Sequence, residues 1–170
     1  MPSSSSKGEP FIKSWLPKIE PRVRILDVGC GKGKLPGRYR EPGQHWTGVE
    51  IFTPYIRRLK LHTKYEKVIN ADARKLLFGA DTYDLVLLGD VLEHMEVEEA
   101  RDILRRALIA APWAIVSMPM GYYPQGTCYG NVWETHVTND WTPELVRELL
   151  GEYIDHAVTP PVGTFIYKRA

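Results

Sequence analysis

A strand that runs into closely spaced glycines is the feature that most limits how this chain can fold. The segment VRILDVGCGKGKLPG, residues 23–37, opens with apolar side chains that predict a buried strand. Three glycines spaced two apart follow, at Gly29, Gly31 and Gly33. Glycine leaves room for a ligand to lie against the backbone. Because such a loop is a weak signal by itself, the rest of the chain has to indicate which ligand it takes.

Strands and helices alternate along about 100 residues, which is typical of a parallel sheet with helices on both faces. Strands are expected at residues 23–29, 46–52, 66–72, 83–90 and 112–119, and the clearest helix at 96–111. Two last strands, at 153–160 and 163–169, are close enough to form a hairpin. We therefore predict an α/β fold with a single Rossmann-like, doubly wound sheet. The sheet is expected to be mostly parallel, with an antiparallel edge hairpin at the C-terminal end.

Composition narrows the possible partners and compartments. The chain has 170 residues and a formal net charge of +1, which gives no overall field to attract nucleic acid or an anionic membrane. No apolar run is long enough to cross a bilayer, and the start MPSSSSKGEP lacks the hydrophobic centre of a signal peptide. The two cysteines, Cys30 and Cys128, are far apart and fit a reducing compartment. We expect a soluble, cytoplasmic protein with a disordered tail at residues 1–10 and a single domain at residues 11–170.

Small and acidic residues stand where four of the expected strands end. Ligands of doubly wound sheets bind beyond the carboxyl ends of the strands, where the strand order reverses. These strand-end positions are Gly29, Glu50, Asp72 and the pair Gly89-Asp90. Their agreement is a stronger indication of a ligand site than any one motif.

Two ordinary nucleotide motifs fit the glycine loop poorly. A nucleoside-triphosphate loop needs GxxxxGK followed by Ser or Thr, but Leu35 follows Gly33-Lys34 and Val28 stands five residues before Gly33. A dinucleotide fingerprint, GxGxxG, places its third glycine at position 34, where this chain has Lys34. Glu50 would suit a ribose under the dinucleotide interpretation as well, so it does not discriminate.

A family resemblance gives a third interpretation. LDVGCGKGKL resembles the first motif of class I S-adenosylmethionine-dependent methyltransferases, and TGVEI, INADARKL and YDLVLLGDVLEHM are similar to their later motifs, in order. The resemblance covers residues 23–117 and is closest to the small bacterial and phage type. It implies a seven-stranded methyltransferase fold and S-adenosylmethionine as cofactor. This cofactor has no phosphate, so its loop need not direct a helix dipole at an anion.

The resemblance also implies cofactor-binding roles. Glu50 matches the acid that takes both ribose hydroxyls, and Asp72 matches a residue near the adenine amino group, although Asp72 may instead cap the turn that follows it. Asp27 is expected to position the loop near the cofactor's ammonium group. The expected cofactor-binding residues are Asp27, Gly29, Gly31, Gly33, Glu50, Asp72, Ala73, Gly89 and Asp90.

Histidine is the usual base for a hydroxyl acceptor. Of five histidines, His94 follows the fourth strand and His136 lies in the long loop after the fifth strand, so both are candidate catalytic residues. The alternative for His94 is a structural role, in which its packed side chain holds the helix turn against the sheet. His45, His62 and His156 fall away from the ligand edge and are expected to be structural or solvated.

The long loop at residues 119–141 is expected to contact the acceptor, because loops of this length are often functional. Its aromatic, amide and carboxylate groups would suit a polyol or glycan, and its NVWETH stretch resembles the N-x-x-E-x-H segment of methyltransferases associated with glycan gene sets. The alternative is a lid whose aromatic side chains only pack on the core. The expected substrate-binding residues are Tyr123, Gln125, Asn131, Trp133 and Glu134.

A metal is not predicted. Glu134 and His136 together with His94 would offer ligands, but their spacing is not diagnostic of a metal site.

The sequence thus predicts a methyltransferase that modifies an oxygen of a small molecule or sugar. Enzymes that methylate nucleic-acid amines carry Asn or Asp, Pro, Pro and an aromatic residue after the fourth strand, whereas this chain has Gly89-Asp90-Val91-Leu92. We therefore expect a small-molecule or glycan partner, no nucleic acid and no membrane; nothing indicates an oligomeric state. Two rivals stay open: an NAD(P)-dependent oxidoreductase, and a catalytically silent S-adenosylmethionine-binding module that acts with a partner.

Overall fold

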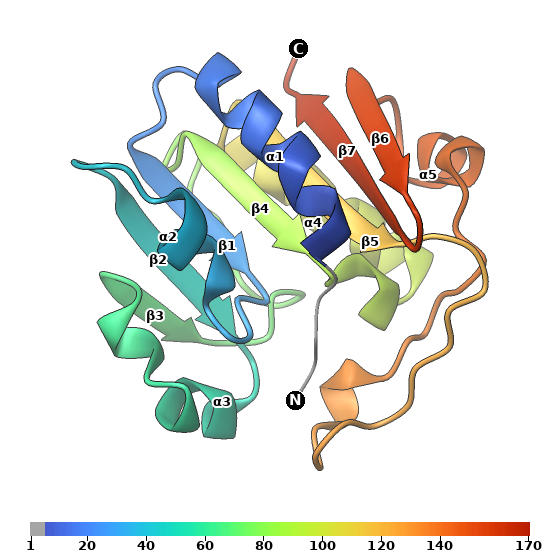
Figure 1. The fold of residues 1–170 in the computed structure, drawn as a ribbon, viewed down its shortest axis with the longest axis horizontal. Coiled ribbons are helices and arrows are strands. Elements are labelled where there is room, and N and C mark those ends of the chain that lie inside the picture. Colours follow the sequence, from blue (N-terminus) through green and yellow to red (C-terminus); the bar gives the residue numbers. More distant parts are fainter. Residues whose placement is uncertain (1–5) are drawn as a thin grey trace.

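A seven-stranded sheet forms the middle layer of the computed structural model, which describes residues 6–170 (Figure 1). The strand order is β3-β2-β1-β4-β5-β7-β6. The strands are β1 (Arg24–Val28), β2 (His45–Glu50), β3 (Lys67–Asn70), β4 (Leu85–Gly89), β5 (Trp113–Pro119), β6 (Asp155–Thr159) and β7 (Val162–Lys168). Neighbouring strands are parallel except where β7 pairs with β5 and with β6. The predicted fold class is confirmed, including the C-terminal hairpin.

Helices cover both faces of this sheet (Figure 1). The helices are α1 (Glu9–Trp15), α2 (Lys34–Tyr39), α3 (Thr53–Arg58), α4 (Val97–Ala110) and α5 (Pro143–Leu150), with short 3-10 turns at Ser6–Gly8, Leu16–Lys18, Leu61–Thr63, Leu92–His94 and Val132–Glu134. One core holds buried side chains of α1, α2 and α3, and the other holds those of α4 and α5. Because side chains alternate along a strand, Ile25 enters the first core while Leu26 enters the second.

Strand β4 is apolar throughout because it is buried on both faces. Leu85 and Leu87 lie in one core, and Val86 and Leu88 lie in the other. A parallel strand at the centre of a doubly covered sheet has no solvated face, so no polar alternation is expected. After β3, the chain crosses to the other side of β1 to form β4. The reversal of strand order therefore falls between β1 and β4.

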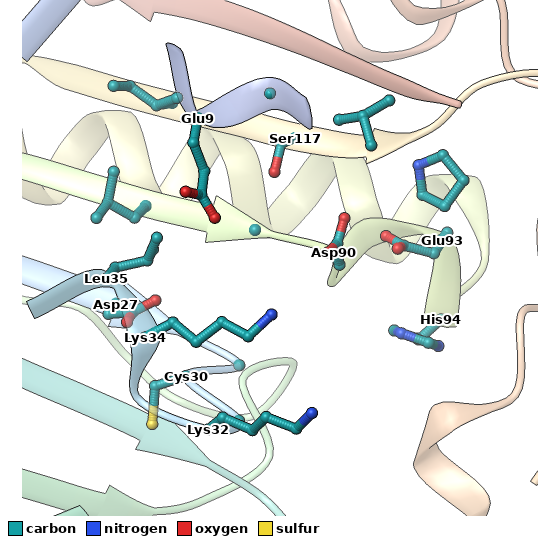
Figure 2. Close-up of a pocket in the computed structure, with 18 of the residues that line it drawn as sticks. Glu9, Asp27, Cys30, Lys32, Lys34, Leu35, Asp90, Glu93, His94 and Ser117 are labelled. Carbon is teal, nitrogen blue, oxygen red and sulfur yellow. The ribbon is translucent and has the colours of Figure 1, made fainter. Parts of the chain in front are cut away.

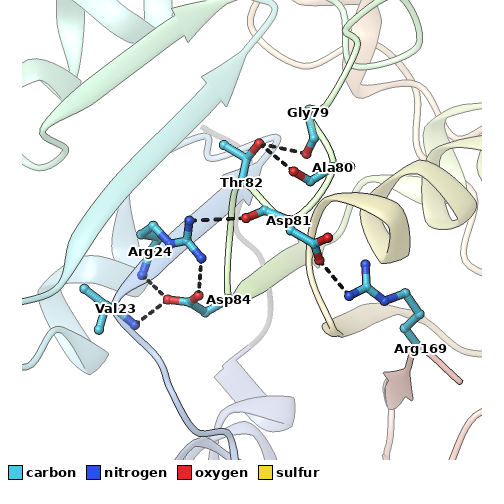
Figure 3. Close-up of polar contacts among 8 residues, drawn as sticks. All are labelled: Val23, Arg24, Gly79, Ala80, Asp81, Thr82, Asp84 and Arg169. Atoms are coloured by element: carbon cyan, nitrogen blue, oxygen red, sulfur yellow. Dashed lines mark hydrogen bonds and ion pairs between the residues drawn. The ribbon is translucent and has the colours of Figure 1, made fainter.

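Asp84 fixes the amino end of β1 beside β4 (Figure 3). One of its carboxylate oxygens accepts from the backbone N–H groups of Val23 and Arg24 at 2.8 and 2.7 Å. The other accepts from the Arg24 guanidinium at 2.7 Å. Because β1 and β4 also pair in parallel, their carboxyl ends emerge side by side at the opposite edge of the sheet.

The N-terminal prediction was wrong for residues 6–10. Residues 1–5 lie outside the described part of the chain, but Ser6–Gly8 form a turn and α1 begins at Glu9. Lys7 donates to the carbonyl of Pro160 at 2.7 Å, and Gly8 packs against the side chain of Thr164 in β7. The Ser-rich composition suggested disorder because it contains few apolar residues. Contacts with the distant hairpin order the segment instead, and the boundary expected at residue 11 falls inside α1.

None of the helices in residues 6–170 is both long enough and apolar enough to span a membrane. The cytoplasmic location stays a prediction.

Candidate functional site

A pocket opens beyond the carboxyl ends of β1, β4 and β5, at the reversal of strand order (Figure 2). The glycine loop forms one wall and the turn at Leu92–His94 another, while Glu9 of α1 reaches in from the N-terminal segment. A second pocket adjoins it beyond β2 and β3. Both pockets are lined by Gly29, Asp90, His94 and Glu134. Together the pockets form a two-lobed cleft with these residues at its junction.

The three loop glycines all have a left-handed backbone, with φ of 66°, 47° and 60°. The space that each glycine leaves open is used differently. A Cβ on Gly29 would lie 2.3 Å from Val91, and one on Gly33 would lie 2.8 Å from Lys64, so these two glycines make room for protein atoms. At Gly31 the nearest atom would be a backbone oxygen at 3.7 Å. Gly31 lines the first pocket, and the space beside its Cα belongs to the cleft. Gly33 lines neither pocket.

Glu50 holds the glycine loop from the end of β2. One carboxylate oxygen accepts from the Gly31 N–H at 3.0 Å and the other from the Phe52 N–H at 2.8 Å. Burial raises the pKa of this carboxyl, and the two N–H donors oppose that rise. Glu50 lines the second pocket, where its oxygens have further lone pairs for a diol.

Asp27 lies beneath the loop, 2% exposed, and accepts from the Tyr65 hydroxyl at 2.5 Å. Burial raises the pKa of Asp27 to about 7, against the opposing effect of the Tyr65 hydrogen bond. Its side chain lines the first pocket, as Figure 2 shows. This placement suits the expected role of positioning the loop.

The Asp72 carboxylate is hydrogen-bonded to Arg74, two residues along the chain. The Arg74 guanidinium donates to both of its oxygens, with the shortest contact at 2.8 Å, and the Arg74 N–H donates to the same carboxylate at 3.0 Å. These hydrogen bonds hold the pKa of Asp72 below its usual range. These contacts match the alternative in which Asp72 caps the turn that follows it. Asp72 and Ala73 nevertheless both line the second pocket. Sequence reasoning missed Arg74, which also lies 5.1 Å from the Trp133 ring and so joins the two walls of that pocket.

His94, at the junction of the lobes, meets His136 of the first pocket, with ring centroids 4.9 Å apart. The Nδ1 atom of His94 lies 3.1 Å from the Thr135 carbonyl, and that of His136 lies 2.5 Å from the Tyr123 carbonyl. Since a carbonyl only accepts, Nδ1 of each ring is the donor in these contacts. The backbone of Asp90 also interacts with the His94 ring. Burial lowers the pKa of His94 to about 4 and also lowers the pKa of His136.

Glu93 is a site residue that sequence reasoning did not single out. It is 1% exposed, and both of its carboxylate oxygens are buried without a hydrogen-bond partner. Burial raises its pKa well above the usual range, and the Asp90 charge adds to the rise. Figure 2 shows Glu93 beside Asp90 and His94. The available signal was an acid directly before the candidate His94 and three residues after Asp90.

Asp90 has an unusual backbone for a non-glycine residue. Its φ is 52°, and its N–H donates to the Ser117 carbonyl at 2.8 Å. Left-handed conformations of this kind are costly and concentrate at functional sites. Gly89 and Asp90 both line the first pocket, as expected.

Most of the expected acceptor residues line the cleft. Tyr123, Gln125 and Glu134 line the first pocket, and Trp133 lines the second. Asn131 lines neither. It is buried, accepts from the Trp133 N–H at 3.1 Å and donates to Glu134 at 3.3 Å, so it braces the turn that carries these two residues.

The fold and cleft define a doubly wound α/β protein with a ligand site at its glycine loop, and comparison with known proteins gives the class. A family model described as "Methyltransferase domain" matches residues 26–111, half of the chain. The chain belongs to this methyltransferase domain family. An S-adenosylmethionine-dependent methyltransferase from Mesorhizobium loti has a similar fold, with a TM-score of 0.73 and 16% identity over 96% of this chain and 98% of that one.

Two curated relatives extend the comparison. A tRNA (carboxymethyluridine(34)-5-O)-methyltransferase from Arabidopsis thaliana is 26% identical over 89% of this chain and 34% of its own length. A ubiquinone biosynthesis O-methyltransferase from Cereibacter sphaeroides is 24% identical over 74% of this chain and 59% of its own length. The chain thus spans about a third of the length of the first relative and about three-fifths of the length of the second. Membership of the methyltransferase domain family argues against the oxidoreductase alternative.

Proposed function

We propose that this chain is an S-adenosylmethionine-dependent methyltransferase that transfers the methyl group to a hydroxyl oxygen of a small molecule or sugar. The observation that carries the proposal is the pair His94 and His136, whose ring centroids lie 4.9 Å apart and which both line the first lobe of the cleft. A hydroxyl acceptor has a proton to lose, and a free imidazole nitrogen can take it. Both curated relatives described above are named as O-methyltransferases, which supports the same choice of atom.

Bound S-adenosylmethionine supplies a methyl group that its sulfonium already activates. The open space over Gly31 and the carboxylate of Glu50 fit its amino-acid and ribose parts. The second lobe, between Ala73 and Trp133, suits the adenine ring. Residues of this chain would then act mainly by orienting the two reactants and excluding water.

The acceptor would enter the first lobe. Tyr123, Gln125 and Glu134 face this lobe from the loop after β5. The Gln125 side chain donates to the backbone carbonyl of Glu134 at 2.7 Å. This hydrogen bond holds two segments of the loop together. An aromatic face beside polar groups is the combination that recognises a ring bearing hydroxyls.

The test is a panel of acceptors under one assay, release of S-adenosylhomocysteine, with the site of methylation read by mass spectrometry. The panel contains phenols, catechols, monosaccharides, small amines and RNA oligonucleotides. We expect turnover with a hydroxyl-bearing small molecule and an O-methyl product. Transfer only to nitrogen, or only to RNA, would overturn the proposal.

A further inference from the structure

We propose that Glu93, His94 and His136 form a divalent-metal site, with one carboxylate oxygen and two imidazole nitrogens as protein ligands. One ligand atom from each of the three residues lies within 4.8 Å of the others. The inference deepens the proposed function, on which it rests for its purpose. With their lone pairs on the ion, the histidines would not take the proton themselves, and the ion would lower the pKa of a bound acceptor hydroxyl so that its proton leaves to water. It also goes beyond the sequence, whose spacing predicted no metal.

The hydrogen bonds of the two histidines prepare them as ligands. In each ring Nδ1 donates to a backbone carbonyl, of Thr135 for His94 and of Tyr123 for His136. Metal-binding histidines nearly always donate their second ring N–H in this way, because the bond fixes the tautomer and the orientation of the ring. A single such bond is common in proteins. Two of them, on rings whose centroids lie 4.9 Å apart, give both histidines a second-ring-nitrogen contact typical of metal ligands.

The third ligand is a carboxylate that lacks a partner. Both oxygens of Glu93 are buried without a hydrogen bond, and the charged groups that act on it are the carboxylates of Asp90 and Glu134. A buried carboxylate is costly unless it is paired or coordinates a metal. A divalent cation among these acids would balance their charge.

The backbone joins the loop to the turn that carries the other two ligands. The carbonyl of Glu93 accepts from the N–H groups of Val137 and Thr138 at 2.8 and 3.1 Å. The His136 N–H donates to the Gln125 carbonyl at 2.9 Å. These bonds hold His136 beside Glu93 and His94, so the three ligands are positioned before any ion arrives.

The ligand set indicates the kind of metal. Two imidazoles and one carboxylate suit Zn²⁺ and other first-row transition ions better than Mg²⁺ or Ca²⁺, which prefer oxygen ligands alone. Three protein ligands also leave positions open for an acceptor oxygen. His94 lines both lobes of the cleft, so an oxygen held there would face the cofactor's side.

The test measures binding of the metal alone. The protein is stripped with a chelator, dialysed and titrated with Zn²⁺ by calorimetry. It is then titrated with Co²⁺, whose absorption spectrum separates imidazole from thiolate ligation. We expect one equivalent to bind with a nitrogen-oxygen spectrum. His136→Ala and Glu93→Gln should weaken binding by about 100-fold or more, since even the loss of an outer hydrogen bond costs about 10–100-fold.

His62→Ala is the matched control, because His62 is exposed and lines neither pocket. It should bind metal as the unaltered protein does. Glu93 is buried, whereas His136 is only partly buried on a loop, so the two substitutions differ in their cost to the fold. Thermal melts of both variants accompany the titrations and identify the folded ones.

Two results would overturn the metal site: no binding of either ion to the unaltered protein, or equal binding to folded His136→Ala. A parallel titration with S-adenosylmethionine separates this failure from that of the proposed function. Cofactor binding and O-methyl transfer without metal binding would refute the site alone and leave direct proton transfer to Nε2. One equivalent of metal with transfer only to nitrogen would support the site and refute the hydroxyl acceptor.

Discussion

The Glu50 carboxylate accepts a hydrogen bond from the Gly31 N–H at 3.0 Å, so the end of β2 holds the glycine loop that follows β1. The same carboxylate accepts from the Phe52 N–H at 2.8 Å. Glu50 therefore shapes the loop, and its remaining lone pairs are the ones that the proposed ribose contact would use.

Glu50→Gln should weaken S-adenosylmethionine binding by about 1.5–3 kcal/mol, the range of a hydrogen bond to a charged group. The amide has one acceptor oxygen for the two backbone N–H donors that the carboxylate serves. Calorimetric titration measures the change. Glu148→Gln, an exposed position on α5, is the matched control and should bind normally. Unchanged affinity in Glu50→Gln would exclude the ribose role.

Gly31→Val should abolish cofactor binding while the protein still folds. Gly31 has φ of 47°, so a branched side chain is strained there, and the side chain would fill the cleft rather than strike protein. Gly43→Val is matched, because Gly43 also has a positive φ, 84°, with open space beside it, but lines neither pocket. We expect both variants to lose about 1–2 kcal/mol of stability. If Gly31→Val kept its affinity, the loop would not be the cofactor site.

Asp27 should make the free energy of unfolding depend on pH. Its pKa is about 7 in the folded protein against an ordinary value of 3.8, so the folded state binds the proton more tightly than the unfolded state. The contribution of Asp27 to the free energy of unfolding is therefore fully present at low pH and is lost as the pH rises from about 4 to 7. At about 1.4 kcal/mol per pKa unit, the loss amounts to a few kcal/mol.

Asp27→Asn removes that loss and keeps an oxygen for the Tyr65 hydroxyl. Denaturant unfolding of both proteins, without cofactor, at a series of pH values from 4 to 8 gives the comparison. The stability of the variant relative to the unaltered protein should increase with pH. A constant difference would show that Asp27 does not titrate in this range.

His94→Ala and His136→Ala should each lower turnover by about 10²–10⁴-fold once the acceptor is known, because each removes a group that acts on the acceptor hydroxyl. Cofactor affinity should stay nearly intact in His136→Ala, since His136 lines only the first lobe. Steady-state kinetics with calorimetry separates these effects. Near-normal turnover in both variants would mean that transfer depends on positioning alone.

Gly8→Ala tests the ordered N-terminal segment. A Cβ at Gly8 would lie 2.5 Å from the Thr164 hydroxyl oxygen and 3.1 Å from Val162, so we expect a loss of about 1–3 kcal/mol. Gly37→Ala, in α2 with open space around it, should instead gain about 0.5–1 kcal/mol. Thermal and denaturant unfolding measure both. Equal stabilities would show that residues 6–8 do not pack on β7 in solution.

The sequence by itself predicted the sheet, the cofactor and the meeting of the strand-end residues at one edge of the sheet. Its strands and helices are set by short-range apolar patterns, and the right-handed crossovers of alternating strands and helices leave few topologies. Gly29, Glu50, Asp72 and Asp90 stand at strand ends, and the carboxyl ends of parallel strands meet at one edge. Their meeting in one cleft therefore follows from chain order alone.

Only the tertiary structure decided what these side chains contact. Gly29 and Gly33 serve neighbouring protein atoms, Asp72 is held by Arg74, and Asn131 braces a turn rather than lining the cleft. The meeting of His94 with His136, and the burial of Glu93 beside them, depends on how the loop after β5 folds back on the turn after β4. A loop without periodic pattern takes its path from contacts with distant segments, and local sequence does not encode those contacts.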